Sequence, residues 1–177
     1  MLGARYIEHI HDDLVAQLWP GTALPGPGGV RDGGLLESAV ARPFQSAFGQ
    51  DAYPTVFEKA VALFHSLNAN HPFQDGNKRT AVIALNHFLL ANDYWHIISN
   101  AGVYEIAKRT ASYRERCLSH DDSLSEISNT LRPMVIPLSA LKPIWYKGRA
   151  QDDFYKHLTQ LKQRIRRDKR NRLFPSA

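Results

Sequence analysis

Cysteine is almost absent from this sequence of 177 residues, which contains only Cys117. A single cysteine excludes an internal disulfide framework and a cysteine-rich zinc site. Long apolar runs are also missing, since none approaches the roughly 20 residues that a membrane-spanning helix needs. We also expect no secretory signal peptide at the start of the chain. We therefore expect a cytoplasmic protein.

Two common catalytic motifs are missing as well. The chain has no Gly-x-x-x-x-Gly-Lys-Ser/Thr loop and no His-Glu-x-x-His sequence, which excludes a P-loop enzyme and a zinc protease of that type. The run Gly26-Pro-Gly-Gly29 resembles a dinucleotide-binding loop only superficially, because no strand precedes it and the third glycine is misplaced. This run is typical of a turn-rich loop.

Charge is present but unevenly distributed along the chain, whose formal net charge is +5 at pH 7. Residues 1–141 contain 11 basic and 14 acidic residues, whereas residues 142–177 contain 11 basic and 3 acidic ones. The net charges of the two parts are therefore −3 and +8. The basic run at residues 163–172 could contact nucleic-acid phosphates. It could equally be a solvated helix, a partner-docking surface or a frayed end.

Apolar residues recur at helical spacing along most of the chain, and we expect an all-α fold with one short hairpin within residues 45–53. The segment at 77–91 is apolar on nearly every side, which is typical of a buried central helix. Proline residues then separate a helical domain at 1–132 from a linker and basic C-terminal helix at 133–177. The expected helices span residues 4–18, 33–42, 54–67, 77–91, 103–118, 124–131 and 152–172.

The segment from His71 to Thr80 breaks a local rule between two apolar helices. Lys78 and Arg79 fall in the first turn of the central helix, where the helix dipole makes cations unfavourable by roughly 0.3–1 kcal/mol each. An anion at the helix N-terminus would explain both cations, because free backbone N–H groups there bind phosphate. Gly76 has no Cβ and would let the backbone approach such a ligand closely.

Two further residues of this segment suit phosphate chemistry. Asp75 could bind magnesium, which takes one or two carboxylates together with substrate phosphates. His71 has an ordinary pKa near 6.5, which suits a general base at neutral pH. Taken singly, His71 reads as a structural histidine, Asp75 as a helix cap and the cations as solvated side chains. Their combination in one short loop favours a catalytic site.

The sequence His71-Pro-Phe-Gln-Asp-Gly-Asn-Lys-Arg79 resembles the signature of the Fic/Doc superfamily, in particular its death-on-curing (Doc) branch. Residues 29–43 and 53–60 resemble further segments of that branch, in the same order. The resemblance covers about residues 6–131. It implies an all-helical fold and the transfer of part of a nucleotide to a hydroxyl group of a protein.

The resemblance also implies a role for each residue of the segment. His71 corresponds to the catalytic base, Asp75 to the magnesium ligand and Phe73 to the anchor of the loop in the core. The residues that correspond to the nucleotide-phosphate site are Gly76, Asn77, Lys78 and Arg79. Residues 43–54 correspond to the flap that positions the target.

Departures from the AMP-transferring members favour a kinase. Lys78 replaces a glycine of those members, and Val82 occupies the place of their second arginine. Doc-type toxins share both differences and transfer the γ-phosphate of ATP, with elongation factor Tu as the implied target. The alternatives are a Fic-type adenylyltransferase and a non-catalytic nucleic-acid-binding or interaction protein on a Fic scaffold.

The absence of a self-inhibitory motif indicates which kind of partner this protein has. A self-inhibitory Ser/Thr-x-x-x-Glu-Gly/Asn sequence is absent, since Arg116 stands four residues after Ser112. We therefore expect a cognate antitoxin, supplied by a second protein, to restrain a toxin of bacterial or phage origin.

Overall fold

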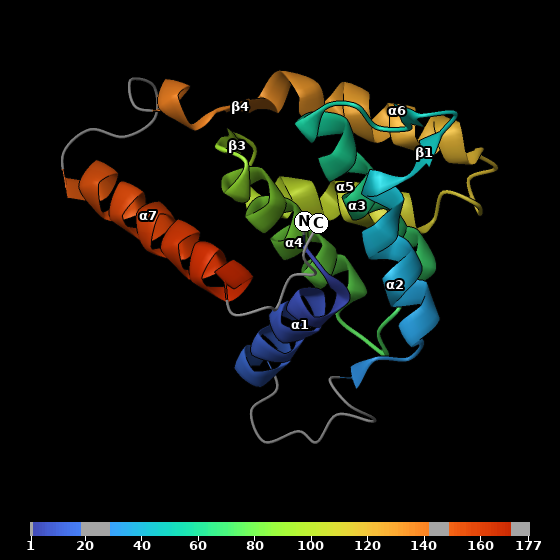
Figure 1. Cartoon of the computed structure of the whole chain (residues 1–177), viewed down its shortest axis with the longest axis horizontal. Coiled ribbons are helices and arrows are strands. Elements are labelled where there is room, and N and C mark those ends of the chain that lie inside the picture. Colours follow the sequence, from blue (N-terminus) through green and yellow to red (C-terminus); the bar gives the residue numbers. More distant parts are fainter. Residues whose placement is uncertain (1, 19–28, 142–148, 171–177) are drawn as a thin grey trace.

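The computed structural model describes residues 2–18, 29–141 and 149–170. Within these ranges the fold is all-α, as predicted (Figure 1). No helix of the described part is long and apolar enough to cross a membrane. The helices are α1 (Ala4–Leu18), α2 (Gly33–Ala41), α3 (Val56–Asn70), α4 (Asn77–Ala91), α5 (Asn100–Ala111), α6 (His120–Leu131) and α7 (Arg149–Arg170).

Helix α4 occupies the centre of the molecule and packs against α1, α3, α5 and α7. Side chains on several sides of α4 are fully buried, including Ala81, Ala84 and Leu90. This arrangement explains why the segment is apolar all round. Because α4 is enclosed by four helices, its N-terminus is held in a fixed place relative to the loop that precedes it.

Side-chain caps set where two of the helices begin. The Asp32 carboxylate accepts a hydrogen bond of 3.0 Å from the Leu35 N–H at the start of α2. Thr55 and Glu58 form a capping box at the start of α3, which satisfies two N–H groups that the helix itself leaves unpaired. Pro54 therefore precedes the cap, and the prediction that it lies in the first turn is wrong.

The short hairpin predicted within residues 45–53 is present. Strands β1 (Ser46–Ala47) and β2 (Gln50–Asp51) pair antiparallel. Phe48 and Gly49 join them with positive φ angles of 55° and 77°, as a tight hairpin turn requires. The Phe48 side chain is fully exposed.

A second pair of strands was not predicted. Strand β3 (Tyr94–His96) follows α4 and pairs antiparallel with β4 (Val135–Pro137). Three residues are too few to show an alternating pattern, so the sequence carries no signal for either strand. Short 3-10 turns flank several of these elements: η2 (Arg42–Phe44), η3 (Arg132–Met134) and η4 (Leu138–Ala140).

Helix α5 ends earlier than its apolar pattern indicated. The predicted helix at residues 103–118 stops at Ala111, and a series of turns follows. Cys117 in these turns has a φ of 56°, in the left-handed region that a continuing right-handed helix excludes. A new helix, α6, begins after the Ser119 cap, four residues before the predicted start at Leu124.

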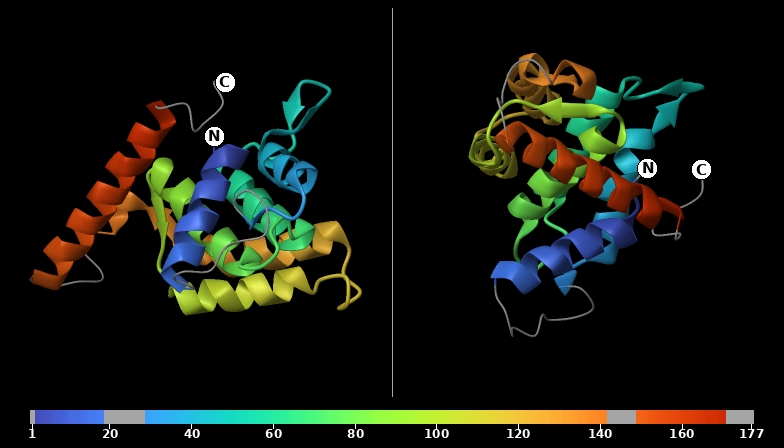
Figure 2. Two further views of the ribbon diagram at one scale, coloured as in Figure 1. Left: turned by 90° about the horizontal axis from the view of Figure 1, so that it is seen from below. Right: turned by 90° about the vertical axis from the view of Figure 1, so that its left-hand side faces the viewer.

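The basic helix α7 lies along the side of the molecule opposite α2 (Figures 1 and 2). Its Leu158 and Ile165 side chains are buried in the main core. Arg164 donates a hydrogen bond of 2.8 Å to Asp13 of α1, and Lys162 pairs with Asp93 after α4. Part of the positive charge of the C-terminal segment is thus paired with acidic residues of the body.

The domain boundary predicted after residue 132 stays a prediction. Strand β4 and the buried Leu141 lie beyond it and pack with the preceding residues. Two parts of the predicted extension fall outside the described residues, at 142–148 and 171–177.

Candidate active site

The predicted site segment forms the loop between α3 and α4, and backbone hydrogen bonds fix it beside the chain that leads into α2 (Figure 1). The Gln74 N–H donates to the Gly29 carbonyl at 2.9 Å, and the Arg31 N–H donates to the Pro72 carbonyl at 2.8 Å. Val30 and Phe73 form an isolated antiparallel bridge. These contacts hold the loop against residues 29–31.

Phe73 and Asn77 hold the same loop on its buried side. The Phe73 side chain is only 1% exposed. The Asn77 amide donates to the Phe73 carbonyl and accepts from the Phe73 N–H, both at 2.9 Å. The Asn77 side chain is therefore engaged in closing the loop, which leaves only its backbone N–H available for the anion site.

His71 ends α3 in a left-handed conformation, with φ 49° and ψ 57°. This conformation is strained for a residue with a side chain. Within the described part of the chain, the His71 Nε2 atom is buried and has no hydrogen-bond partner. Burial lowers the pKa of His71 below its usual value, and the positive charges of Lys78 and Arg31 lower it further. The imidazole is thus neutral at pH 7, with one nitrogen free to accept a proton.

A pocket of about 160 Å³ brings the predicted residues together. The anchor residue Phe73 lies behind it, in the core. Gln74 and Tyr104 line the pocket too, although the sequence did not single them out. The predicted residues in its lining are His71, Asp75, Gly76, Asn77, Lys78 and Arg79.

Gly76 forms the turn from this loop into α4. Its φ of 76° and ψ of −1° lie in the left-handed region, which glycine adopts without strain. Its N–H donates to the Asp75 carboxylate at 2.6 Å. An N–H at the start of a helix thus already binds an oxygen anion in this pocket.

The two cations lie at the start of α4, and Arg79 contacts α5. The Arg79 guanidinium lies 5.7 Å from the centre of the Tyr104 ring, and the Lys108 ammonium approaches the same ring at 5.8 Å. Tyr104 stands 25 residues after Arg79 in the sequence, so no local pattern links the two. Only the packing of α5 against α4 brings Tyr104 to the pocket.

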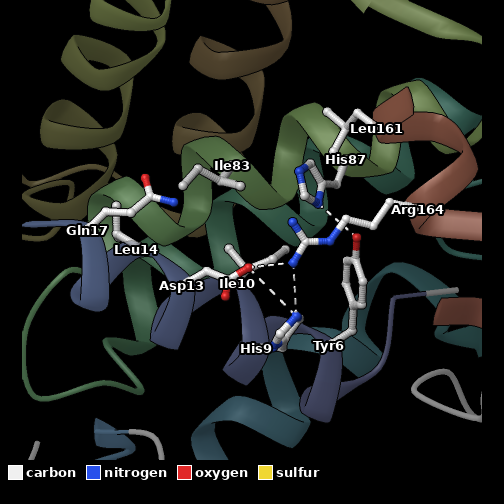
Figure 3. Close-up of a pocket in the computed structure, with 10 residues that line it drawn as sticks. All are labelled: Tyr6, His9, Ile10, Asp13, Leu14, Gln17, Ile83, His87, Leu161 and Arg164. Atoms are coloured by element: carbon white, nitrogen blue, oxygen red, sulfur yellow. Dashed lines mark hydrogen bonds and ion pairs between the residues drawn. The ribbon is translucent and has the colours of Figure 1, made fainter. Parts of the chain in front are cut away.

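A second pocket, also of about 160 Å³, lies between α1, α4 and α7 (Figure 3). Arg164 reaches into it toward His9 and Asp13, and the Tyr6 hydroxyl bonds His87 at 2.9 Å. It contains none of the predicted site residues. We therefore place the candidate active site at the α3–α4 loop.

The site combines a neutral imidazole, a carboxylate, backbone N–H groups and two cations. Among the described residues no cluster of three metal-binding side chains exists. Asp75 is exposed toward solvent at the pocket, and magnesium accepts one carboxylate when phosphate oxygens complete its shell. The residues of the site therefore fit a nucleotide phosphate that shares a magnesium ion with Asp75.

Comparison with known proteins identifies the family of this site. The model of the Fic/DOC family matches residues 2–89, which include the α3–α4 loop. The chain belongs to this family, as its resemblance predicted. Fic/DOC proteins are transferases that use ATP, generally with Mg²⁺.

The particular similarity is to a toxin. Over 63 residues the chain is 56% identical to "Toxin Doc" of Mycolicibacterium smegmatis (strain ATCC 700084 / mc(2)155). The match covers 36% of this chain and 48% of that protein, so the chain spans about half the length of the curated relative. No solved structure matches the chain.

Proposed function

We propose that this protein is a Doc-like toxin that transfers the γ-phosphate of ATP to a hydroxyl group of a target protein. The observation that carries the proposal is the position of His71. Its neutral imidazole has an unpartnered, buried Nε2 atom and lines one pocket with Lys78 and the N-terminus of α4. A proton acceptor and a phosphate-binding surface are therefore adjacent.

The reaction proceeds by in-line displacement. The target hydroxyl oxygen bonds to the γ-phosphorus, and its proton passes to the His71 imidazole. The bond from the γ-phosphorus to the β–γ bridging oxygen breaks, and ADP leaves with the electron pair. Lys78, Arg79 and the free N–H groups of α4 stabilise the charge on the phosphate oxygens.

Asp75 would hold a magnesium ion that also binds the phosphates. Such an ion neutralises phosphate charge and orients the nucleotide. The Asp75 side chain lines the pocket beside Gly76, where it is close to the anion-binding N–H groups. Among the described residues no other carboxylate lines this pocket, so Asp75 is the protein ligand that we propose.

Residues at the start of α4 favour γ-phosphate transfer over adenylyl transfer. Lys78 stands where AMP-transferring enzymes have glycine, and Val82 stands where they have a second arginine. Val82 is buried in the core, so this position of α4 contributes no cation to the pocket. The resemblance to Doc toxins suggests elongation factor Tu as the target.

Purified protein with a bacterial lysate tests the proposal. ATP labelled at the γ or the α position is added in parallel reactions, and labelled proteins are separated and identified. We expect label from the γ position on elongation factor Tu and none from the α position. Label from the α position would instead support the adenylyltransferase. No label from either position, together with binding of nucleic acid, would support the non-catalytic alternative.

We also propose that an antitoxin restrains the enzyme in trans. Ser112 lies at the C-terminal end of α5, and Arg116 follows four residues later, where the self-inhibitory motif would have glutamate. This segment therefore does not carry the self-inhibitory motif. Co-expression with a small reading frame next to the gene should abolish growth arrest. Growth arrest that persists despite a stable complex of the two proteins would contradict this partner.

A further inference from the structure

His11 of α1 contacts the active-site loop, although 64 residues separate it from Asp75. We propose that His11 is a positioning residue that orients the peptide bond between Asp75 and Gly76, so that the Gly76 N–H faces the phosphate. This role deepens the proposed phosphotransferase function and rests on it.

Two contacts fix the His11 ring. Its Nε2 atom lies 3.0 Å from the Asp75 carbonyl oxygen, and since a carbonyl only accepts, Nε2 carries the proton. The ring stacks on Phe73, with 4.1 Å between ring centres and 4° between ring planes. The side chain is 1% exposed, so water cannot replace this donor.

The geometry of the peptide bond transmits this contact to the pocket. The described residues contain no cis peptide bond, so the Asp75 carbonyl and the Gly76 N–H point in opposite directions from one plane. His11 holds the carbonyl toward α1. The N–H must therefore point away from α1, and there it donates to the Asp75 carboxylate at 2.6 Å.

That carboxylate oxygen marks the position of an anion. A phosphate oxygen placed there would receive the same hydrogen bond from Gly76, at the positive end of α4. Rotation of the peptide by 180° would instead present the carbonyl oxygen, which repels phosphate. His11 thus favours the one orientation that binds a nucleotide.

The opposite side of α1 contacts α7 instead of the active-site loop. His9 and Asp13 face Arg164 of α7 (Figure 3), two residues to either side of His11. The His9 side chain is partly exposed, and within the described part of the chain its polar contacts are with Asp13 and Arg164 instead of the loop. His9 therefore provides a matched control on the same helix.

Two substitutions separate the hydrogen bond of His11 from its stacking. His11→Phe keeps an aromatic ring against Phe73 but removes the donor. His11→Gln places an amide N–H near the position of Nε2 but removes the ring. The control His9→Phe leaves the loop contacts in place.

The measurements are the KM for ATP, kcat, and the amide signal of Gly76 in ¹H–¹⁵N spectra of the nucleotide-free protein. A single hydrogen bond changes an equilibrium about three- to tenfold. For His11→Phe we expect KM to rise by that factor and the Gly76 signal to move. For His11→Gln we expect both to return toward wild type, and for His9→Phe we expect neither to change.

A Gly76 signal that stays in place in a folded His11→Phe protein would overturn the proposal. If His11→Phe does not fold, the His11→Gln variant tests the proposal instead. A Gly76 signal of His11→Gln that is displaced from its wild-type position would also overturn the proposal. The Gly76 signal needs no activity. If the wild type transfers no phosphate, the proposed function fails, while this signal still reports whether His11 orients the peptide.

Discussion

His71 combines a strained backbone with a neutral, partly buried imidazole. The left-handed conformation at the end of α3 directs the following residues into the loop instead of another helical turn. Strain of this kind persists only where surrounding contacts enforce it, and here the hydrogen bonds to residues 29–31 do so. The result is an imidazole whose position is set by the backbone on both of its sides, as the proposed role of a base requires.

Replacing His71 by alanine should abolish transfer and toxicity. General-base catalysis contributes about 10²- to 10⁴-fold, so the labelled-ATP assay should lose at least two orders of magnitude of rate. Circular dichroism should show an unchanged helical spectrum, because the imidazole Nε2 makes no hydrogen bond to the described residues. The matched substitution His9→Ala should keep its activity.

The rate should also depend on pH in a defined direction. The pKa of His71 is lowered by burial, then by Lys78 and Arg31. The proposed base is therefore neutral above its lowered pKa and is lost by protonation as the pH falls below it. Arg31→Met removes one positive charge and should raise this pKa. The acid limb of the kcat profile should then move to higher pH, whereas Arg132→Met, remote from this pocket, should leave it unchanged.

At the scale of the element, the α3–α4 loop is closed by one side chain. Asn77 pairs with both backbone groups of Phe73, so it serves as a clamp between the loop and the first turn of α4. Asn77 thus holds the loop at Phe73, and His11 holds it at the Asp75 carbonyl.

Asn77→Ala should destabilise the protein by about 2–4 kcal/mol, because it leaves a buried N–H and a buried carbonyl unpaired. Urea unfolding measures this loss. Asn92→Ala offers a matched control, since Asn92 makes one such bond, to the Phe88 carbonyl, at an exposed position. An equal effect of the two substitutions would contradict the clamp.

The sequence predicted those elements whose cause is local. Helices α1 and α2 followed from the spacing of their apolar residues. The role of His11 did not follow, since its partner is 64 residues away. A signal was nevertheless present: His11 stands four residues after Ile7 and three before Leu14, on the apolar face of α1. A histidine on such a face needs a buried partner.

At the scale of the whole molecule, α7 extends the core instead of lying beside it. Leu158 and Ile165 enter the core. On the same helix, Lys162 forms an ion pair with Asp93, and Arg164 forms one with Asp13. The exposed cations that remain include Lys156, Arg166 and Arg167. These are the described residues of α7 that an outside polyanion could reach.

Removing apolar contacts of α7 should cost more than removing its ion pairs. Ile165→Ala should lower the free energy of unfolding by about 2–5 kcal/mol. Asp13→Asn should lower it by about 1 kcal/mol or less, because exposed ion pairs contribute little. Urea unfolding of both variants, with the exposed Gln163→Ala as reference, tests this order, and the reverse order would show that charge holds the helix.

Two buried histidines should make the folded protein sensitive to acid. Burial, followed by the charges of His120 and Arg42, lowers the pKa of His65 to about 3, and burial lowers that of His87 to about 4. Both groups bind protons more readily when unfolded. The contribution of these two groups to stability is therefore fully present above pH 6.5. It is lost as the pH falls from 6.5 toward the folded-state pKa values, by about 1.4 kcal/mol per pH unit for each histidine.

His65→Phe should weaken this dependence on acid. Both ring nitrogens of His65 lack a partner among the described residues, so an apolar ring removes a protonation site without breaking a hydrogen bond. Thermal melting between pH 7 and pH 5 measures the slope. An unchanged slope would assign the acid sensitivity to other groups.

The hydrogen bond from Gly76 to the Asp75 carboxylate has a thermodynamic consequence. In the proposed nucleotide complex, the Asp75 carboxylate would compete with a phosphate oxygen for the hydrogen atom of the Gly76 N–H. A cation that draws Asp75 away releases that hydrogen, and an anion that takes it releases the carboxylate. The two ligands therefore bind with positive cooperativity, and linkage requires each to strengthen the other by the same factor.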